Sequence, residues 1–190
     1  MEIQRYRLNR SSGLIYRIIE YPFRLEEVGE ALDIIILHAT PPVRGQPFAN
    51  MPEQDWIGLC FLDPELNWAF TLLNSGKSQA LRSFLNYTNK HELSSVTTRI
   101  SLISQTSHRG TQWFSYTFEA FPLPNINVSE IFNHHYEYPL IDPTVNLEFP
   151  PANRDEILSR IISQQTPIDN THEIFDMEDI ETRSKFLIWN

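Results

Sequence analysis

Apolar and polar residues alternate with a period of two in two neighbouring stretches near the middle of the chain. The inward-facing positions are Val96, Thr98, Ile100 and Leu102 in the first stretch and Phe114, Tyr116, Phe118 and Ala120 in the second. This period is typical of half-buried β-strands, because successive side chains of a strand point to opposite faces. A polar segment, residues 104–111, separates the two stretches. The pattern therefore predicts two antiparallel strands joined by a turn.

A second hairpin is predicted just upstream. Two apolar stretches, residues 56–63 and 67–73, flank the short segment DPELN at positions 63–67. Pro64 presets the backbone for the second position of a turn, and Asp63 can accept hydrogen bonds from the turn backbone. The segment therefore predicts a tight turn between two strands.

Two helices are predicted, because apolar residues recur every three to four positions in residues 77–89 and 153–165. Asn74 or Ser75 can cap the first helix, and Asn153 can cap the second, with a glutamate three residues later. The predicted packing faces consist of Ala80, Leu81, Phe84, Leu85 and Thr88 in the first helix and Ile157, Leu158, Ile161 and Ile162 in the second.

The N-terminal part of the chain is less regular. Residues 13–21 are rich in β-branched and aromatic side chains, and residues 31–40 form a nearly continuous apolar run, so both are predicted to be strands. Residues 23–30 carry three glutamates and are expected to form a short helical turn. Residues 1–12 alternate basic and apolar side chains, which indicates either an edge strand or a loosely held arm.

Two long segments lack a periodic pattern. Residues 41–55 contain four prolines, and a connection of this length in a compact domain is more often functional than filler. Residues 122–152 are rich in proline and aromatic side chains, and we expect them to form an ordered wrap without regular structure.

From residue 31 onwards the predicted order is strand, long loop, strand, tight turn, strand, helix, strand, loop, strand. The five-stranded OB barrel has this order. We therefore expect an α+β, mainly β fold: an OB-like five-stranded barrel with a helix between strands 3 and 4, a C-terminal helix and an acidic tail. Residues 1–165 are expected to form one globular domain with its barrel core at about 31–121, and residues 166–190 an acidic tail or docking segment.

Charge is distributed unevenly along the 190 residues, whose formal net charge is −9. Residues 1–130 hold 11 Lys and Arg against 13 Asp and Glu, a balance of −2, whereas residues 131–190 hold 4 against 11, a balance of −7. Residues 66–120 contain five Lys and Arg but only two acidic residues, Glu92 and Glu119, which gives a balance of +3. A locally basic body is compatible with an anionic ligand, the alternative being that these are ordinary solvated surface charges.

The ligand face of an OB barrel lies on its second and third strands, between the loops that join strands one to two and four to five. Here those loops are residues 41–55 and 104–111. A single-strand binder needs cations for the phosphates and flat rings for the bases, each stacked base being worth about 1–3 kcal/mol. The predicted nucleic-acid-binding residues are Arg44, Trp56, Trp68, Lys77, Arg99, Arg109 and Trp113. The competing interpretation is that strand aromatics, Trp56 or Trp68 among them, belong to the core.

Three stretches, NSGKSQALRSFLNYTNK, SVTTRISLI and GTQWFSYTFEAF, follow one another within residues 66–121. This layout of helix, strand and aromatic closing strand resembles small single-stranded-DNA-handling proteins of phages and mobile elements. The resemblance covers about a third of the chain and implies single-stranded nucleic-acid binding in an accessory role in replication or recombination. It also implies that an acidic tail, here residues 166–190, recruits a protein partner. Arg183 and Lys185 interrupt that tail, and an acidic surface helix is the alternative there.

No pattern indicates an enzyme, a cofactor or a metal site. The tripeptide GKS at positions 76–78 lies where a phosphate-binding loop would lie, but Thr71 stands where that loop needs a glycine. His134 and His135 are adjacent and lack a third ligand at a recognisable spacing. Cys60 has no neighbouring base in the sequence. We therefore expect a non-catalytic protein.

A single cysteine cannot form an intramolecular disulfide and favours a reducing compartment, so we expect a cytoplasmic protein. No apolar run is long enough for a signal peptide or a membrane span, and no membrane association is expected. The alternative function is a protein-interaction subunit of a larger complex that makes no nucleic-acid contact. The net charge of −9 and the segment 122–152 favour that alternative.

Overall fold

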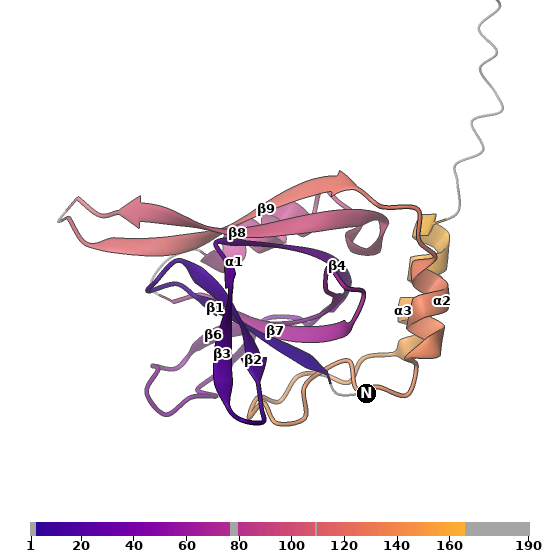
Figure 1. Ribbon diagram of the computed structural model, residues 1–190, viewed down its shortest axis with the longest axis horizontal. Coiled ribbons are helices and arrows are strands. Elements are labelled where there is room, and N and C mark those ends of the chain that lie inside the picture. Colours follow the sequence, from indigo (N-terminus) through magenta and orange to yellow (C-terminus); the bar gives the residue numbers. More distant parts are fainter. Residues whose placement is uncertain (1–2, 77–79, 109, 166–190) are drawn as a thin grey trace, which may run out of the picture.

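Nine strands form one strongly curled, open sheet in the computed structural model, which describes residues 3–76, 80–108 and 110–165 (Figure 1). The strands are β1 Gln4–Asn9, β2 Leu14–Ile19, β3 Arg24–Gly29, β4 Ala31–Ala39, β5 Val43–Gly45, β6 Gln54–Leu62, β7 Trp68–Asn74, β8 Val96–Thr106 and β9 Gln112–Pro122. Their order in the sheet is β3-β2-β1-β7-β6-β4-β8-β9, with β5 paired to β6. The helices of the described chain are α1 Ala80–Thr88, α2 Val128–His134 and α3 Arg154–Gln165, with a 3-10 turn η1 at Leu93–Ser95. The fold is therefore α+β and mainly β, as predicted.

Two apolar cores lie on opposite faces of the central strands. The inner core fills the curl of the sheet beneath α1, and its members include Ile15, Ile57, Leu59, Phe61, Phe84 and Tyr116. The outer core lies beneath α2 and α3, which stand together beside the sheet (Figure 1), and its members include Leu37, Leu62, Trp68, Phe132, Ile157 and Ile161. Burying each of the large aliphatic or phenyl side chains contributes about 1.5–3 kcal/mol relative to leaving it exposed.

The two cores explain why β4 has a nearly continuous apolar sequence. Successive side chains of a strand alternate between the faces of the sheet, so a strand covered on both faces needs apolar residues at every position. In β4, Ile34 and Ile36 enter the inner core, whereas Ile35 and Leu37 enter the outer core. The strand predicted over residues 31–40 is confirmed.

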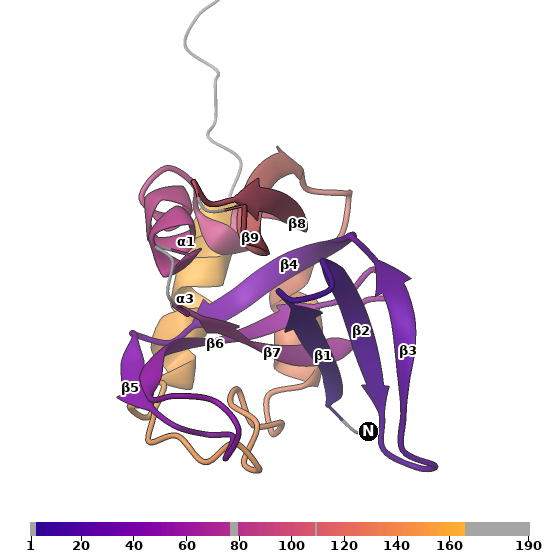
Figure 2. The same ribbon diagram turned by 90° about the vertical axis from the view of Figure 1, so that its left-hand side faces the viewer.

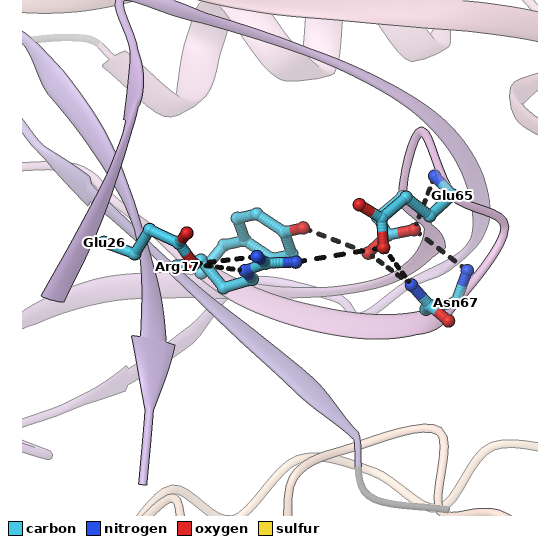
Figure 3. Close-up of polar contacts among 6 residues, drawn as sticks. Arg17, Glu26, Glu65 and Asn67 are labelled. Atoms are coloured by element: carbon cyan, nitrogen blue, oxygen red, sulfur yellow. Dashed lines mark hydrogen bonds and ion pairs between the residues drawn. The ribbon is translucent and has the colours of Figure 1, made fainter. Parts of the chain in front are cut away.

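The turn between β6 and β7 is held by the buried carboxylate of Asp63. Figure 3 shows two residues of this turn, Glu65 and Asn67, with their polar contacts. The Oδ1 of Asp63 accepts hydrogen bonds from the backbone N–H groups of Glu65 and Asn67, each at 2.9 Å, which confirms the predicted role of Asp63. Its Oδ2 accepts the hydroxyl of Tyr6 at 3.0 Å. Burial and then the neighbouring Asp63 raise the pKa of Tyr6, so the phenol stays a neutral donor. Tyr6 thereby ties β1 to this turn.

The five strands predicted for a barrel are present as β4, β6, β7, β8 and β9, but they do not close on themselves. β4 pairs with β6 and with β8, β6 pairs with β7, and β8 pairs with β9, all antiparallel. Closure would require β7 to pair with β9. Instead, β7 pairs in parallel with β1, and the sheet continues through β2 and β3. The sheet is an open half-barrel, so an OB-like five-stranded barrel is not confirmed.

The N-terminal predictions need correction. β1 is neither an edge strand nor a loose arm, because it pairs with β2 on one side and β7 on the other. Residues 23–30 contain the strand β3 instead of a helical turn, and most of its side chains face solvent, which suits its glutamates. The short strand β5 lies within the predicted loop 41–55, and α2 lies within the predicted irregular wrap.

The predicted helices are confirmed as α1 and α3. The Oδ1 of Asn153 accepts the N–H of Glu156 at 3.2 Å, which is the predicted cap. Two residues of the predicted packing faces, Leu85 on α1 and Ile162 on α3, are instead exposed, at 41% and 49%. None of the described helices is both long and apolar enough to cross a membrane. The predicted acidic tail, residues 166–190, lies outside the described residues.

Candidate nucleic-acid interface

A long stretch of the chain is free of acidic residues. Between Glu92 and Glu119 there is no Asp or Glu, although the whole chain contains 24 of them. This stretch forms most of the β8–β9 hairpin, and α1, which precedes it, also contains no acid. We call α1 together with the β8–β9 hairpin the acid-poor lobe. Along the part of the hairpin between Thr97 and Phe118, a phosphate-bearing ligand would meet little repulsion from carboxylates of the hairpin itself.

The acid-poor lobe is held together by aromatic packing. The rings of Phe84 and Tyr87 on α1 lie 5.2 Å and 5.7 Å from the ring of Phe118 on β9, centroid to centroid. The Tyr87 hydroxyl and Thr98 Oγ1 are hydrogen-bonded at 2.8 Å in the interior. These contacts fix α1 against the hairpin, so the lobe is a rigid platform for exposed side chains.

The β8–β9 hairpin extends beyond the body of the protein (Figure 1). We call its outer part, residues 103–115, the hairpin arm. Ile103 pairs with Ser115 and Gln105 pairs with Trp113, so the strands stay in register along the arm. At its tip, Ser107 accepts the N–H of Thr111 through its hydroxyl at 3.0 Å. The turn is thus shorter than the predicted segment 104–111, and the strands are longer.

Two of the predicted binding residues share one face of this hairpin. Residues paired directly across an antiparallel ladder point to the same face, and so does every second residue along each strand. One face, which we call the outer face, therefore carries Trp113, Ser115, Thr117 and Glu119 on β9 and Gln105, Ile103, Ser101 and Arg99 on β8, with the acidic Glu119 directly opposite Arg99. Arg99 and Gln105, the cross-strand partner of Trp113, are six residues apart, or about 20 Å at about 3.3 Å per residue. That span matches about six stacked nucleotides at 3.4 Å each.

The outer face offers several kinds of contact. Of the described tryptophans, Trp113 is the one that is not buried. Ile103 is 43% exposed. Serine, threonine and glutamine side chains between them can donate and accept hydrogen bonds. The opposite face, with Ile100, Leu102 and Tyr116, enters the inner core.

Arg99 is already engaged on this face. Its Nε and Nη2 donate to the two carboxylate oxygens of Asp33 at 2.7 Å and 2.8 Å, and its guanidinium lies 4.9 Å from the ring centroid of Phe121. The hydrogen bond to Arg99 lowers the pKa of Asp33 and, reciprocally, raises the pKa of Arg99. Both partners are about two-fifths exposed, so the pair is accessible to a competing anion.

The base of the hairpin arm is anchored to the turn between β1 and β2. Arg10 Nε donates to the Phe114 carbonyl at 2.9 Å, and the Phe114 N–H donates to the Arg10 carbonyl at 3.1 Å. Gly13, at φ +75°, lies so close to the Phe114 ring that a Cβ would overlap it. This contact restrains Phe114, so the hairpin arm begins at a fixed point. Sequence patterns did not indicate this anchor, because it joins residues about a hundred positions apart.

Trp56 and Trp68, two of the predicted binding residues, are both buried, as the competing interpretation of strand aromatics as core residues has it. Trp56 is 3% exposed, and its Nε1 donates to the Gly45 carbonyl at 3.0 Å. Trp68 is 1% exposed, lies in the outer core, and donates to the Pro139 carbonyl at 3.2 Å. Neither ring is available for stacking on a base. Trp68 is buried by the outer core, which the wrap and the helices after residue 122 complete. Trp56 is instead covered by the segment that carries Gly45 and Phe48.

The remaining predicted residues do not join the outer face. Arg44 lies on β5, far from β8 and β9 in Figure 2, and pairs with Asp55 at 3.3 Å and Glu53 at 3.9 Å. Lys77 and Arg109 lie outside the described residues. The structure therefore brings together Arg99 and Trp113 alone among the seven, within the described chain. Ile103 was not predicted, although it alternates with the core positions of β8 just as Arg99 does.

Other chemistry-bearing side chains serve the fold. Cys60 is buried, and burial raises the pKa of its thiol. The ring of His135 stacks on Tyr138 at 5.0 Å, beside Trp68. Among the described residues no group of three or more His, Cys, Asp or Glu side chains could hold a metal ion.

Comparison with known proteins finds no matching family, no matching curated protein and no matching solved structure.

Proposed function

We propose that this protein is a non-catalytic module that binds single-stranded nucleic acid, and DNA in particular, along the outer face of the β8–β9 hairpin. The observation that carries the proposal is the absence of acid between Glu92 and Glu119, in a projecting hairpin that presents Arg99 and Trp113 on one face of a protein with net charge −9. Carboxylates elsewhere would repel phosphates and steer a strand toward this face. Such a module would be an accessory to replication or recombination.

The strand pairing supports this use of the hairpin. The pairs β4–β6, β6–β7, β4–β8 and β8–β9 are those expected for an OB-like arrangement of these five strands. In OB folds the loop between the fourth and fifth strands borders the ligand. The tip of the hairpin arm occupies that position here. The ligand would accordingly lie on the hairpin instead of on the strands that carry Trp56 and Trp68.

The test is a titration of a fluorescein-labelled twenty-residue oligothymidylate with the protein, followed by anisotropy at 50 mM and 200 mM salt. We expect binding that weakens as salt increases, because each neutralised phosphate releases counterions. W113A is expected to weaken binding by about 1–3 kcal/mol, or roughly 5- to 150-fold, since one stacked base is lost. R99A is expected to weaken binding and to reduce the slope of the salt dependence.

R44A is the matched control, because Arg44 is also an exposed, ion-paired arginine but lies on β5. It should leave the affinity unchanged. No binding at low salt, or equal losses in R44A and R99A, would show that the outer face is not the site. A double-stranded oligonucleotide of the same length distinguishes single-strand binding from general attraction to phosphates.

A protein-docking function is the second candidate. Tyr21 is 95% exposed and Phe23 is 74% exposed, both at the tip of the hairpin that joins β2 to β3. Exposed aromatic side chains of this kind are enriched where proteins dock. A partner protein that copurifies after nuclease treatment, and is lost when Tyr21 and Phe23 are replaced by alanine, would favour this candidate. Retention of the partner by that double variant would exclude the tip as its docking site.

A further inference from the structure

Within the part of the chain that the structure describes, β3 is an edge strand whose outer side has no partner strand. It pairs with β2 alone, and Figure 2 shows it at the margin of the molecule with no other element beyond it. An edge strand presents a row of unpaired backbone N–H and C=O groups, onto which another strand can add. Natural edge strands are commonly protected by charged side chains, proline, β-bulges or a covering element. β3 carries three charged side chains, Arg24, Glu26 and Glu27, so a strand that adds to it has to match their charges. The sequence of β3, RLEEVG, contains neither proline nor lysine.

Exposed apolar side chains are concentrated at this edge. Leu25 and Val28 on β3 are each 40% exposed, and Phe23, directly before the strand, is 74% exposed. With Tyr21 they make up four of the nine large apolar side chains that are exposed in the described part of the chain. Contiguous apolar exposure on a soluble protein marks an interaction surface.

We infer that β3 pairs with β3 of a second copy of this chain, antiparallel and about a two-fold axis that passes between the two Leu25 residues. In a two-fold antiparallel pair the residue on the axis faces its own equivalent. An axis at Glu26 or at Glu27 would set two carboxylates directly opposite each other. An axis at Leu25 instead sets leucine against leucine. Arg24 of each copy then lies opposite Glu26 of the other copy, which gives two pairs of opposite charges. Charge complementarity therefore selects both the second copy as occupant and the register.

The carboxylate of Glu26 is able to make that contact. Arg17 of the same chain donates from Nε and Nη2 to a single oxygen of Glu26, Oε2, at 2.9 Å and 2.7 Å (Figure 3). The Glu26 side chain is 43% exposed, so a guanidinium of a second copy can reach it. Arg24 on the same strand is exposed. One carboxylate can accept from two guanidinium groups at once, because each oxygen has two lone pairs.

Cysteine crosslinking tests the register, because Cys60 is the chain's only cysteine and is buried. Leu25→Cys would bring two thiols together across the axis, within the separation that a disulfide needs. The matched control is Leu85→Cys on α1, since Leu85 is 41% exposed against 40% for Leu25. We expect L25C to convert mostly to a covalent dimer under a mild oxidant at micromolar protein, and L85C to remain mostly monomeric. Equal crosslinking of the two variants would overturn the proposal.

Charge reversal provides a test that does not depend on crosslinking. Sedimentation without nucleic acid measures the dissociation constant of the dimer. For R24E alone and for E26R alone, this constant should be at least tenfold higher than for the wild-type chain, because each variant places two pairs of like charges across the two-fold axis. An equimolar mixture of R24E and E26R should dimerise, because both reversed pairs are then attractive. Failure of the mixture to associate, with both variants folded by circular dichroism, or a wild-type chain that stays monomeric at 100 micromolar, would overturn the proposal. Neither result bears on oligonucleotide binding.

Discussion

Arg99 lies on the proposed binding face with its guanidinium already bonded to Asp33. That hydrogen bond lowers the pKa of Asp33, so the carboxylate stays ionised at neutral pH. A phosphate that reaches Arg99 must share it with this carboxylate or displace it. Asp33 is therefore expected to limit the affinity for a strand while leaving Arg99 in a defined orientation.

Asp33→Asn should accordingly strengthen oligonucleotide binding. Removing one negative charge a few ångströms from the phosphate is worth about 1 kcal/mol in a water-exposed setting, which is roughly a fivefold gain. The measurement is the anisotropy titration at 50 mM salt. Asp55→Asn is the control, because Asp55 pairs with Arg44 on β5 in the same manner. An equal gain in both variants, or no gain in D33N, would contradict a site at Arg99.

His38 on β4 is expected to make stability depend on pH. Burial, with a smaller contribution from the charge of Arg160, lowers the pKa of His38 to about 4, below its ordinary 6.5. The unfolded chain therefore takes up a proton at a higher pH than the folded chain does. The stability linked to neutral His38 is complete above about pH 6.5 and is lost as the pH falls toward 4, by on the order of 2–3 kcal/mol.

Urea unfolding at pH 7 and at pH 4.5, followed by tryptophan fluorescence, measures this loss. The wild-type chain includes the contribution of His38, whereas His38→Gln removes it. The variant should therefore lose about 2 kcal/mol less than the wild type between the two pH values. Identical pH dependence in both chains would mean that His38 protonates equally in the folded and unfolded states.

At the scale of elements, the hairpin arm should be separable from the fold. Its anchor, Phe114, pairs with Ser104, and beyond this pair the register continues between the two strands of the arm, with Gln105 opposite Trp113 and Thr106 opposite Gln112. Replacing residues 105–113 by Asn-Gly would join Ser104 to Phe114 through a two-residue hairpin turn. We expect the free energy of unfolding to change by less than about 1 kcal/mol, because little apolar surface is lost.

The same variant should bind the oligothymidylate at least tenfold more weakly, since Trp113 is removed. Anisotropy and urea unfolding are measured on the same preparation. Retained affinity in a stable variant would place the binding surface elsewhere, on α1 or on the inner part of the hairpin.

Local sequence patterns predicted the elements that are buried on one face or on both faces. β8 and β9 follow from strict alternation, and β4 from a continuous apolar run. β3 was missed because both of its faces are largely exposed, which leaves no period to detect. The central place of β1 was missed because its partner β7 is far away in the sequence, and no local signal encodes a parallel pairing.

At the scale of the whole molecule, the candidate site shows the same difference between features that local patterns indicate and features that depend on distant segments. Trp113 falls out of phase with the core positions of β9, and that local signal correctly indicated the outward face. Trp56 and Trp68 carried no such signal. The burial of Trp68 depends on the segment after residue 122 folding back over the sheet, and Trp56 is covered by the loop residues Gly45 and Phe48. Charge segregation was visible in the sequence, but only the fold shows that Arg99 and Trp113 share a surface while Arg44 does not.

The parallel pairing of β1 with β7 also determines when this part of the sheet can form during synthesis. Three register pairs join the strands, and the Thr71 hydroxyl, 65 residues further along the chain, donates to the Tyr6 carbonyl at 2.8 Å. At 5–20 residues per second, a ribosome needs roughly 3–13 s to make that distance. Until then, the β1–β3 meander exists without the strand that covers its inner edge. β1 is thus made several seconds before the strand that pairs with its second edge, and a chaperone that shields this edge would act within those seconds.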